Sequence, residues 1–271
     1  MPYAKNGNIN IYYEVEGEGT PLVFAHPGGG SIETWKRIGY VDALKGDYRC
    51  ILIDSRGSGQ SDTPHETSAY GPDLYKTDAD DVIVVLDALG VNTSCYYGYS
   101  RGSRAGYQLA VDYPDRFGGF ILGNTSPFEW TGAWADFSKK WAEIFKLYLT
   151  DVEAAVSKQE EFRGSPFSAE EKKNFIALLK RSDKENDLRA IIAMGDIDYY
   201  PLTVDEVAGI SKPCLIYCGD ADDFHIHAQK ASETIPNSTF VSLPGLDHGS
   251  ALANVDTILP HIKEFLSRVI N

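Results

Sequence analysis

Apolar and polar positions follow two periodicities in turn along the first 126 residues of the chain. Segments that are continuously apolar or alternate with period two are typical of strands, and they occur at 9–16, 21–25, 49–54, 94–99 and 119–123. Between them, apolar residues recur at helical spacing in 73–89 and 103–113, and each of these segments stops at a Gly or a Pro. Strands and helices in alternation predict an α/β fold, in which helices flank a mostly parallel sheet.

The alternation stops at Pro127, and from there to Ala208 the pattern is helical. Large apolar residues recur every three or four positions and so share one helical stripe: Trp130, Trp134, Phe137, Trp141, Ile144, Phe145 and Tyr148. Ser168, followed by acidic residues, is typical of a helix N-terminus, and another helix is expected over 183–194.

Strand patterns return after the helical block, at 214–218 and 239–243, and an amphipathic helix is expected over 255–269. The chain therefore divides into two parts. We predict an α/β core made of residues 1–126 and 209–271, with residues 127–208 inserted as a helical cap.

Composition narrows the range of partners. The 271 residues include 25 Lys and Arg against 39 Asp and Glu, a net charge of −14. A surface of this sign repels the phosphates of nucleic acids and of anionic lipids. No apolar run approaches the ~20 residues of a membrane span, and the N-terminus lacks the apolar segment of a signal peptide. We expect a cytoplasmic monomer or homodimer that acts on a small molecule and binds neither nucleic acid nor membranes.

The cysteines and histidines do not favour a metal site. Each Cys lies in a predicted strand, where a free thiol behaves as a small buried hydrophobe. Asp222, Asp223, His225 and His227 form a His-x-His cluster that could bind a transition metal. This segment is, however, expected to open a helix. We expect neither a metal nor a cofactor.

The most informative feature of the chain is a serine between a predicted strand and a predicted helix. The sequence Gly-Tyr-Ser-Arg-Gly at 98–102 fits Gly-x-Ser-x-Gly, the nucleophile elbow. The tight turn presents the serine at the carboxyl edge of the sheet, and the glycines let neighbouring backbone approach without a Cβ clash. We therefore predict that Ser100 is a nucleophile.

A serine hydroxyl needs a base, which in turn needs a carboxylate to orient it. In elbow-containing enzymes the chain order is Ser, then Asp or Glu, then His. Asp220, Asp222 and Asp223 follow a late predicted strand and compete for the carboxylate role. We favour Asp222, with Asp220 second. His248 follows the last predicted strand, on a loop, so the sequence predicts a triad of Ser100, Asp222 and His248.

Acyl transfer also needs hydrogen-bond donors for the developing oxyanion. The sequence His-Pro-Gly-Gly-Gly at 26–30 follows an early predicted strand. Pro27 has no N–H, so we predict that the N–H groups of Gly28 and Arg101 form the oxyanion hole. The loop lacks the lysine and spacing of a phosphate-binding loop. The Arg101 side chain could stand over the site and favour a polar or carboxylate-bearing substrate, or pair with an acid and point away.

These motifs together resemble the α/β-hydrolase superfamily, in the branch of serine hydrolases with a helical cap. The resemblance spans nearly the whole chain and rests on 26–30, 54–61, 98–102, 113–117, 219–222 and 245–248. It implies that Asp222, the last residue of a Gly-x-x-Asp element, is the triad acid. It also separates the chain from the epoxide hydrolases and haloalkane dehalogenases, which carry an aspartate where this chain has Ser100.

The sequence thus predicts a carboxylesterase, a serine hydrolase that cleaves a small carboxylic ester through an acyl-enzyme. The same triad could serve a lactonase, a C–C bond hydrolase, an aminopeptidase or a perhydrolase, or a binding or receptor protein with slow turnover. In this superfamily a cap closes over the elbow. Four rings of the helical stripe are therefore candidates for lining the substrate pocket as well as packing the cap: Trp130, Trp134, Phe137 and Trp141.

Overall fold

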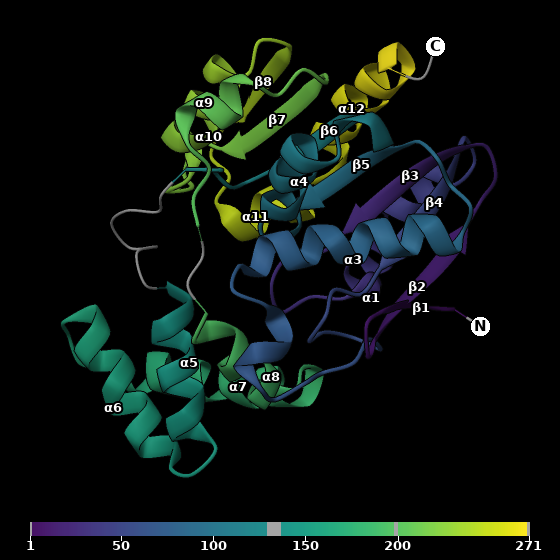
Figure 1. Cartoon of the computed structure of the whole chain (residues 1–271). Coiled ribbons are helices and arrows are strands. Elements are labelled where there is room, and N and C mark those ends of the chain that lie inside the picture. Colours follow the sequence, from purple (N-terminus) through teal and green to yellow (C-terminus); the bar gives the residue numbers. More distant parts are fainter. Residues whose placement is uncertain (1, 129–136, 198–199, 270–271) are drawn as a thin grey trace.

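The computed structural model describes residues 2–128, 137–197 and 200–269 (Figure 1). In these residues the strands form one sheet in the order β1-β2-β4-β3-β5-β6-β7-β8. The strands from β3 onward pair in parallel, and β1 and β2 add an antiparallel edge. Their bounds are β1 Tyr3–Asn6, β2 Ile9–Glu16, β3 Thr20–Ala25, β4 Tyr48–Ile53, β5 Ser94–Tyr99, β6 Phe117–Gly123, β7 Cys214–Gly219 and β8 Ser238–Leu243. The predicted α/β fold is confirmed.

Helices cover both faces of the sheet, and each face has its own apolar core (Figure 1). Along β3 the side chains alternate, so that Val23 packs in one core and Leu22 and Phe24 in the other. The first core is covered by α3 (Leu74–Ala88), α4 (Arg101–Asp112) and α10 (His225–Thr234). The second is covered by α1 (Ile32–Ile38), α2 (Tyr40–Leu44), α11 (His248–Ala253) and α12 (Val255–Val269).

Between β6 and β7 the chain leaves the sheet and builds a separate group of helices, which Figure 1 shows together beyond the core. They are α5 (Phe137–Tyr148), α6 (Val152–Arg163), α7 (Ala169–Glu185) and α8 (Leu188–Gly195). Ile144, Val156 and Leu179 belong to their common apolar core. In contrast, α9 (Val204–Ala208) packs on α4 and α10, and Val207 lies in the core of the sheet. We propose that the cap consists of α5 to α8 and that α9 belongs to the α/β core.

Several elements differ from the sequence-based expectation in their bounds. The helix expected from residue 103 begins at Arg101, directly after the elbow serine. The segment 183–194 is not one helix, because α7 continues to Glu185 and α8 starts after its own N-cap, Asp187. His248, expected on a loop, is the first residue of α11, because the Asp247 side chain caps that helix.

The strand β1 was not predicted from the sequence, although the turn that follows it has a recognisable signal. It pairs with β2 through a hairpin that turns at Gly7, whose φ is 61°. In one of the two common two-residue hairpin turns, the first turn residue has positive φ and is usually Gly. Asn6 is the last residue of β1 and pairs with Ile9, so the two turn residues are Gly7 and Asn8, and this Gly-Asn pair was the available signal. The strand before it has too few residues to show a period.

Candidate active site

Ser100 occupies a constrained turn between β5 and α4. Its backbone has φ 52° and ψ −111°, and its N–H donates to the carbonyl oxygen of Gly123 at 2.9 Å. A Cβ at Gly98 would lie 2.4 Å from the carbonyl oxygen of Gly102, and a Cβ at Gly102 would lie 2.1 Å from that of Ala25. Only glycine fits at both positions, so the local backbone holds the serine at the carboxyl edge of the sheet.

The structure brings Ser100, His248 and Asp222 together from distant parts of the sequence. The Nε2 atom of His248 lies 3.0 Å from the Oγ of Ser100, and its Nδ1 lies 2.7 Å from the Oδ2 of Asp222. A carboxylate only accepts hydrogen bonds, so Nδ1 is the donor and Nε2 is left to accept from the serine hydroxyl. Both distances are within the range of a nucleophile, its base and an orienting acid.

Asp222 is the one of the three candidate acids that the structure places against His248. Its side chain is buried and also accepts from the Nδ2 of Asn124 at 2.6 Å and from the N–H of Phe224 at 3.0 Å. Burial alone would raise the pKa of Asp222, but these hydrogen bonds and that from His248 outweigh it and lower the pKa. The exposed Asp220 instead accepts from a backbone N–H in a neighbouring turn.

Asn124 was missed by the sequence analysis. It follows β6 directly, at the same edge of the sheet as Ser100, and its side chain is buried. A polar residue immediately after a buried strand of a parallel sheet was the available signal. That signal locates the edge of the sheet, but it does not reveal that the amide contacts Asp222.

The glycine-rich loop after β3 lies beside the elbow. A Cβ at Gly28 would lie 3.9 Å from the Cβ of Arg101, so the two predicted oxyanion donors are neighbours. His26 holds this loop, because its Nδ1 donates to the carbonyl oxygen of Pro27 at 2.8 Å and its Nε2 accepts from the N–H of Ser55 at 3.0 Å. Burial lowers the pKa of His26 to about 4, so the ring is neutral at pH 7 and joins the loops after β3 and β4.

The side chain of Arg101 pairs with an acid and is buried. Its Nε and Nη2 each lie 2.8 Å from a carboxylate oxygen of Asp78 on α3. Nη2 also donates to the carbonyl oxygen of Arg56 at 3.0 Å, and Nη1 lies 3.2 Å from the Sδ of Met194 on α8. The structure therefore shows the second of the two arrangements expected for Arg101, in which its charge is matched by a carboxylate.

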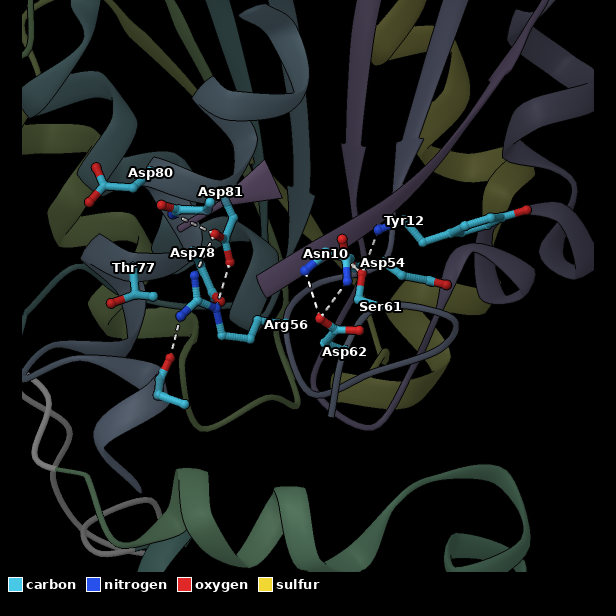
Figure 2. Close-up of polar contacts among 12 residues, drawn as sticks. Asn10, Tyr12, Asp54, Arg56, Ser61, Asp62, Thr77, Asp78, Asp80 and Asp81 are labelled. Atoms are coloured by element: carbon cyan, nitrogen blue, oxygen red, sulfur yellow. Dashed lines mark hydrogen bonds and ion pairs between the residues drawn. The ribbon is translucent and has the colours of Figure 1, made fainter. Parts of the chain in front are cut away.

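A second buried ion pair lies next to this one and fixes the turn after β4. Figure 2 shows Arg56 reaching Asp81 on α3, with Nη2 to Oδ1 2.7 Å and Nε to Oδ2 3.1 Å. Asn6 also donates to Asp81, at 2.8 Å. In the same view Asp62, at the other end of the turn, accepts from the N–H of Asn10 at 2.7 Å. The 54–62 turn is thus bound to α3 on one side and to β2 on the other.

The predicted substrate-lining rings are only partly described. Trp130 and Trp134 lie outside the described residues. Phe137 is the first residue of α5 and is 37% exposed. The Trp141 ring packs in the core of the cap, with centroids 5.3 Å from Phe145 and 6.3 Å from Phe175. A role in lining the pocket stays a prediction for all four.

Two further features bear on ligands and membranes. In the described part of the chain, no group of three or more His, Cys, Asp or Glu side chains is placed to hold a metal ion. In the His-x-His cluster that the sequence contains, Asp222 faces His248, and the Nε2 of His225 lies 2.8 Å from the Oγ of Ser242. Within the same described ranges, no helix has the length and apolar character needed to cross a membrane.

Comparison with known proteins gives partial and full-length relatives. A protein of Azorhizobium caulinodans that is provisionally named a carbamate hydrolase is 34% identical over 116 residues, 43% of this chain but only 41% of that protein. The pimeloyl-acyl-carrier-protein methyl ester esterase of Aliivibrio salmonicida is 25% identical over 269 residues, 95% of this chain and 96% of that protein. The crystal structure of the enol-lactonase from Burkholderia xenovorans LB400 matches with a TM-score of 0.75 at 22% identity, over 98% of this chain and 100% of that one, a likeness of fold.

A family model gives a broader match. The model of the alpha/beta hydrolase fold matches residues 20–252. This range begins with β3 and includes the elbow, the glycine-rich loop, Asp222 and His248. Because the match covers most of the chain, the chain belongs to the alpha/beta hydrolase fold family.

Proposed function

We propose that this protein is a serine hydrolase that cleaves small carboxylic esters, with Ser100, His248 and Asp222 as its catalytic triad. One observation carries the proposal: an unbroken chain of hydrogen bonds runs from the Ser100 hydroxyl through the His248 ring to the Asp222 carboxylate. A full-length relative named as a methyl ester esterase supports the choice of an ester as substrate.

The geometry supports a two-step acyl transfer. The Oγ of Ser100 attacks the ester carbonyl carbon while the Nε2 of His248 takes the hydroxyl proton. The tetrahedral intermediate then expels the alcohol, which receives that proton from His248, and an acyl-Ser100 ester remains. Water, deprotonated by His248, attacks this ester, and the acid leaves as Ser100 regains its proton. Asp222 stays ionised throughout and stabilises the charged ring.

The oxyanion of each tetrahedral intermediate needs donors that are in place beforehand. The proposed donors are the N–H groups of Gly28 and of Arg101, the residue after Ser100, and a Cβ at Gly28 would lie 3.9 Å from the Cβ of Arg101. The Arg101 guanidinium is neutralised by Asp78 and so does not favour an anionic substrate. We therefore propose that uncharged esters are preferred over esters that carry a free carboxylate elsewhere in the molecule.

A fluorophosphonate probe and p-nitrophenyl butyrate test this function. We expect rapid labelling of the wild-type protein and ester turnover, and we expect Ser100→Ala to abolish labelling and to lower kcat by about 10⁴-fold or more. Ser68→Ala, at an exposed serine of the 3₁₀ helix Thr67–Tyr70, is the matched control and should react like the wild type. Full turnover by Ser100→Ala would refute the triad. An unlabelled wild-type protein would favour a binding role.

A further inference from the structure

We propose that Asn124 is a positioning residue that holds the Asp222 carboxylate in line with His248, an inference that rests on the proposed function. The Nδ2 of Asn124 donates to the Oδ2 of Asp222 at 2.6 Å, and this same oxygen accepts from the Nδ1 of His248 at 2.7 Å. The other carboxylate oxygen, Oδ1, accepts from the N–H of Phe224 at 3.0 Å. Asp222 is thus fixed from three directions.

Packing alone does not account for an amide side chain at position 124. The residue is completely buried, and its Oδ1 has no hydrogen-bond partner in the part of the chain that the structure describes. A buried acceptor without a partner destabilises the fold, and an apolar side chain would avoid that cost. The described hydrogen bond of the Asn124 side chain goes to Asp222. The role of the amide is therefore to hydrogen-bond the Asp222 carboxylate and not to fill the core.

The backbone also sets Asn124 apart. Its φ is 45°, in the left-handed region that Gly and Asn tolerate better than other residues. Its N–H donates to the carbonyl oxygen of Tyr217 on β7 at 2.9 Å. The left-handed turn at the end of β6 therefore ties the residue to the neighbouring strand, and Asp222 lies just beyond the end of that strand.

The donor should control the charge on Asp222. The hydrogen bond from Asn124 lowers the pKa of Asp222, as do the hydrogen bonds from His248 and Phe224, against a rise due to burial. Among the described residues, Tyr99 and Cys218 also interact with the charge of Asp222, and burial raises the pKa of both, so both are neutral near pH 7. Asp247, which precedes His248, interacts with the charge of the His248 ring. Without Asn124 the carboxylate becomes more basic and His248 should keep its proton to a higher pH.

The variant Asn124→Gly removes the donor and suits the positive φ, so the backbone should be retained. We expect kcat for p-nitrophenyl butyrate to fall about 10- to 100-fold with KM within about twofold, and the acid limb of the pH profile to move to higher pH. Thr125→Val is the matched control, because Thr125 is the next residue, is also buried and has a hydroxyl without a hydrogen-bond partner among the described residues. Its kcat, KM and pH profile should match those of the wild type.

A second readout does not depend on turnover. The NMR titration of the His248 ring, assigned with His248→Gln, should shift to higher pH in Asn124→Gly and remain in place in Thr125→Val. If Asn124→Gly fails to fold, Asn124→Ala also removes the donor, restricts the backbone more than Gly does, and should move the titration in the same direction. An unchanged titration and kcat in a folded Asn124 variant would overturn the inference. A wild type that cleaves no ester would refute the proposed function, and the titration would still decide the role of Asn124.

Discussion

Glycines 98 and 102 surround the elbow serine because no side chain fits there. A Cβ at either position would come within 2.4 Å of a backbone oxygen, and the backbone cannot move without moving Ser100. Ser100 and Asn124 are the two residues other than glycine with positive φ in the described residues, and both lie at the proposed site. Unusual backbone geometry is thus concentrated where the proposed chemistry takes place.

Replacing Gly98 with Ala tests this constraint. The added Cβ would lie 2.4 Å from the carbonyl oxygen of Gly102, so the elbow must shift. We expect kcat/KM for p-nitrophenyl butyrate to fall by about 10²-fold or more, because displacements of ~1 Å have that effect in active sites. Gly46→Ala is the control, since its Cβ would meet nothing within 4 Å. Equal activity in the two variants would contradict the steric argument.

At the scale of elements, α3 connects parts of the site that are far apart in the sequence. Asp78 and Asp81 are three residues apart and so lie on the same face of the helix. Asp78 binds Arg101, the first residue of α4, and Asp81 binds Arg56 in the turn after β4. Both ion pairs are buried, so α3 positions the elbow helix and this turn relative to each other.

Removing one partner of the Asp78–Arg101 ion pair, which holds α4, should lower the stability of the fold. Asp78→Asn leaves the Arg101 charge buried without its carboxylate, and we expect urea unfolding to show a loss of about 3 kcal/mol. Asp78→Leu combined with Arg101→Met removes both charges, so the free energy of unfolding should fall by less than in Asp78→Asn. Lys76→Met, on the same helix at an exposed pair with Asp112, should change stability by about 0.5 kcal/mol or less. If the double variant is less stable than Asp78→Asn, the loss in Asp78→Asn does not come from burying the Arg101 charge without its carboxylate.

At the scale of the whole molecule, the acidic chain contains a buried neutral histidine next to the proposed site. His26 has its pKa lowered to about 4 by burial, below the ordinary value of 6.5. The unfolded chain therefore binds a proton at His26 between these pH values, and the folded chain does not. Stability contributed by the neutral ring is complete above about pH 6.5 and is lost as the pH falls toward 4.

Urea unfolding at a series of pH values measures this effect. From His26 alone we expect the free energy of unfolding to fall by about 3 kcal/mol between pH 6.5 and pH 4. His26→Gln, which keeps an acceptor but has no titrating ring, should be less stable at pH 7 and show a shallower decline. His261→Gln, at an exposed site, should decline like the wild type. Parallel curves for wild type and His26→Gln would show that the ring does not titrate as expected.

Local patterns along the chain were sufficient for the fold class and for the main candidates of the site. Strand and helix periods are properties of a few neighbouring residues, so β5 and α12 were predicted with the bounds that the structure shows. Ser100, Asp222 and His248 were found from short motifs, each of which directly follows a strand. The roles of these residues in catalysis remain predictions.

The contacts around the proposed triad were decided by the tertiary structure. Asn124 and Asp222 are 98 residues apart, and Arg101 and Asp78 come from different helices, so no local pattern indicates either pair. For the same reason the sequence offered three acids for the contact with His248, of which we favoured Asp222, and it left open where the Arg101 side chain points. A periodicity shows which face of an element is buried. Only the packing of distant elements determines which polar groups meet there, because each buried charge or amide is stabilised by partners that the folded chain brings to it.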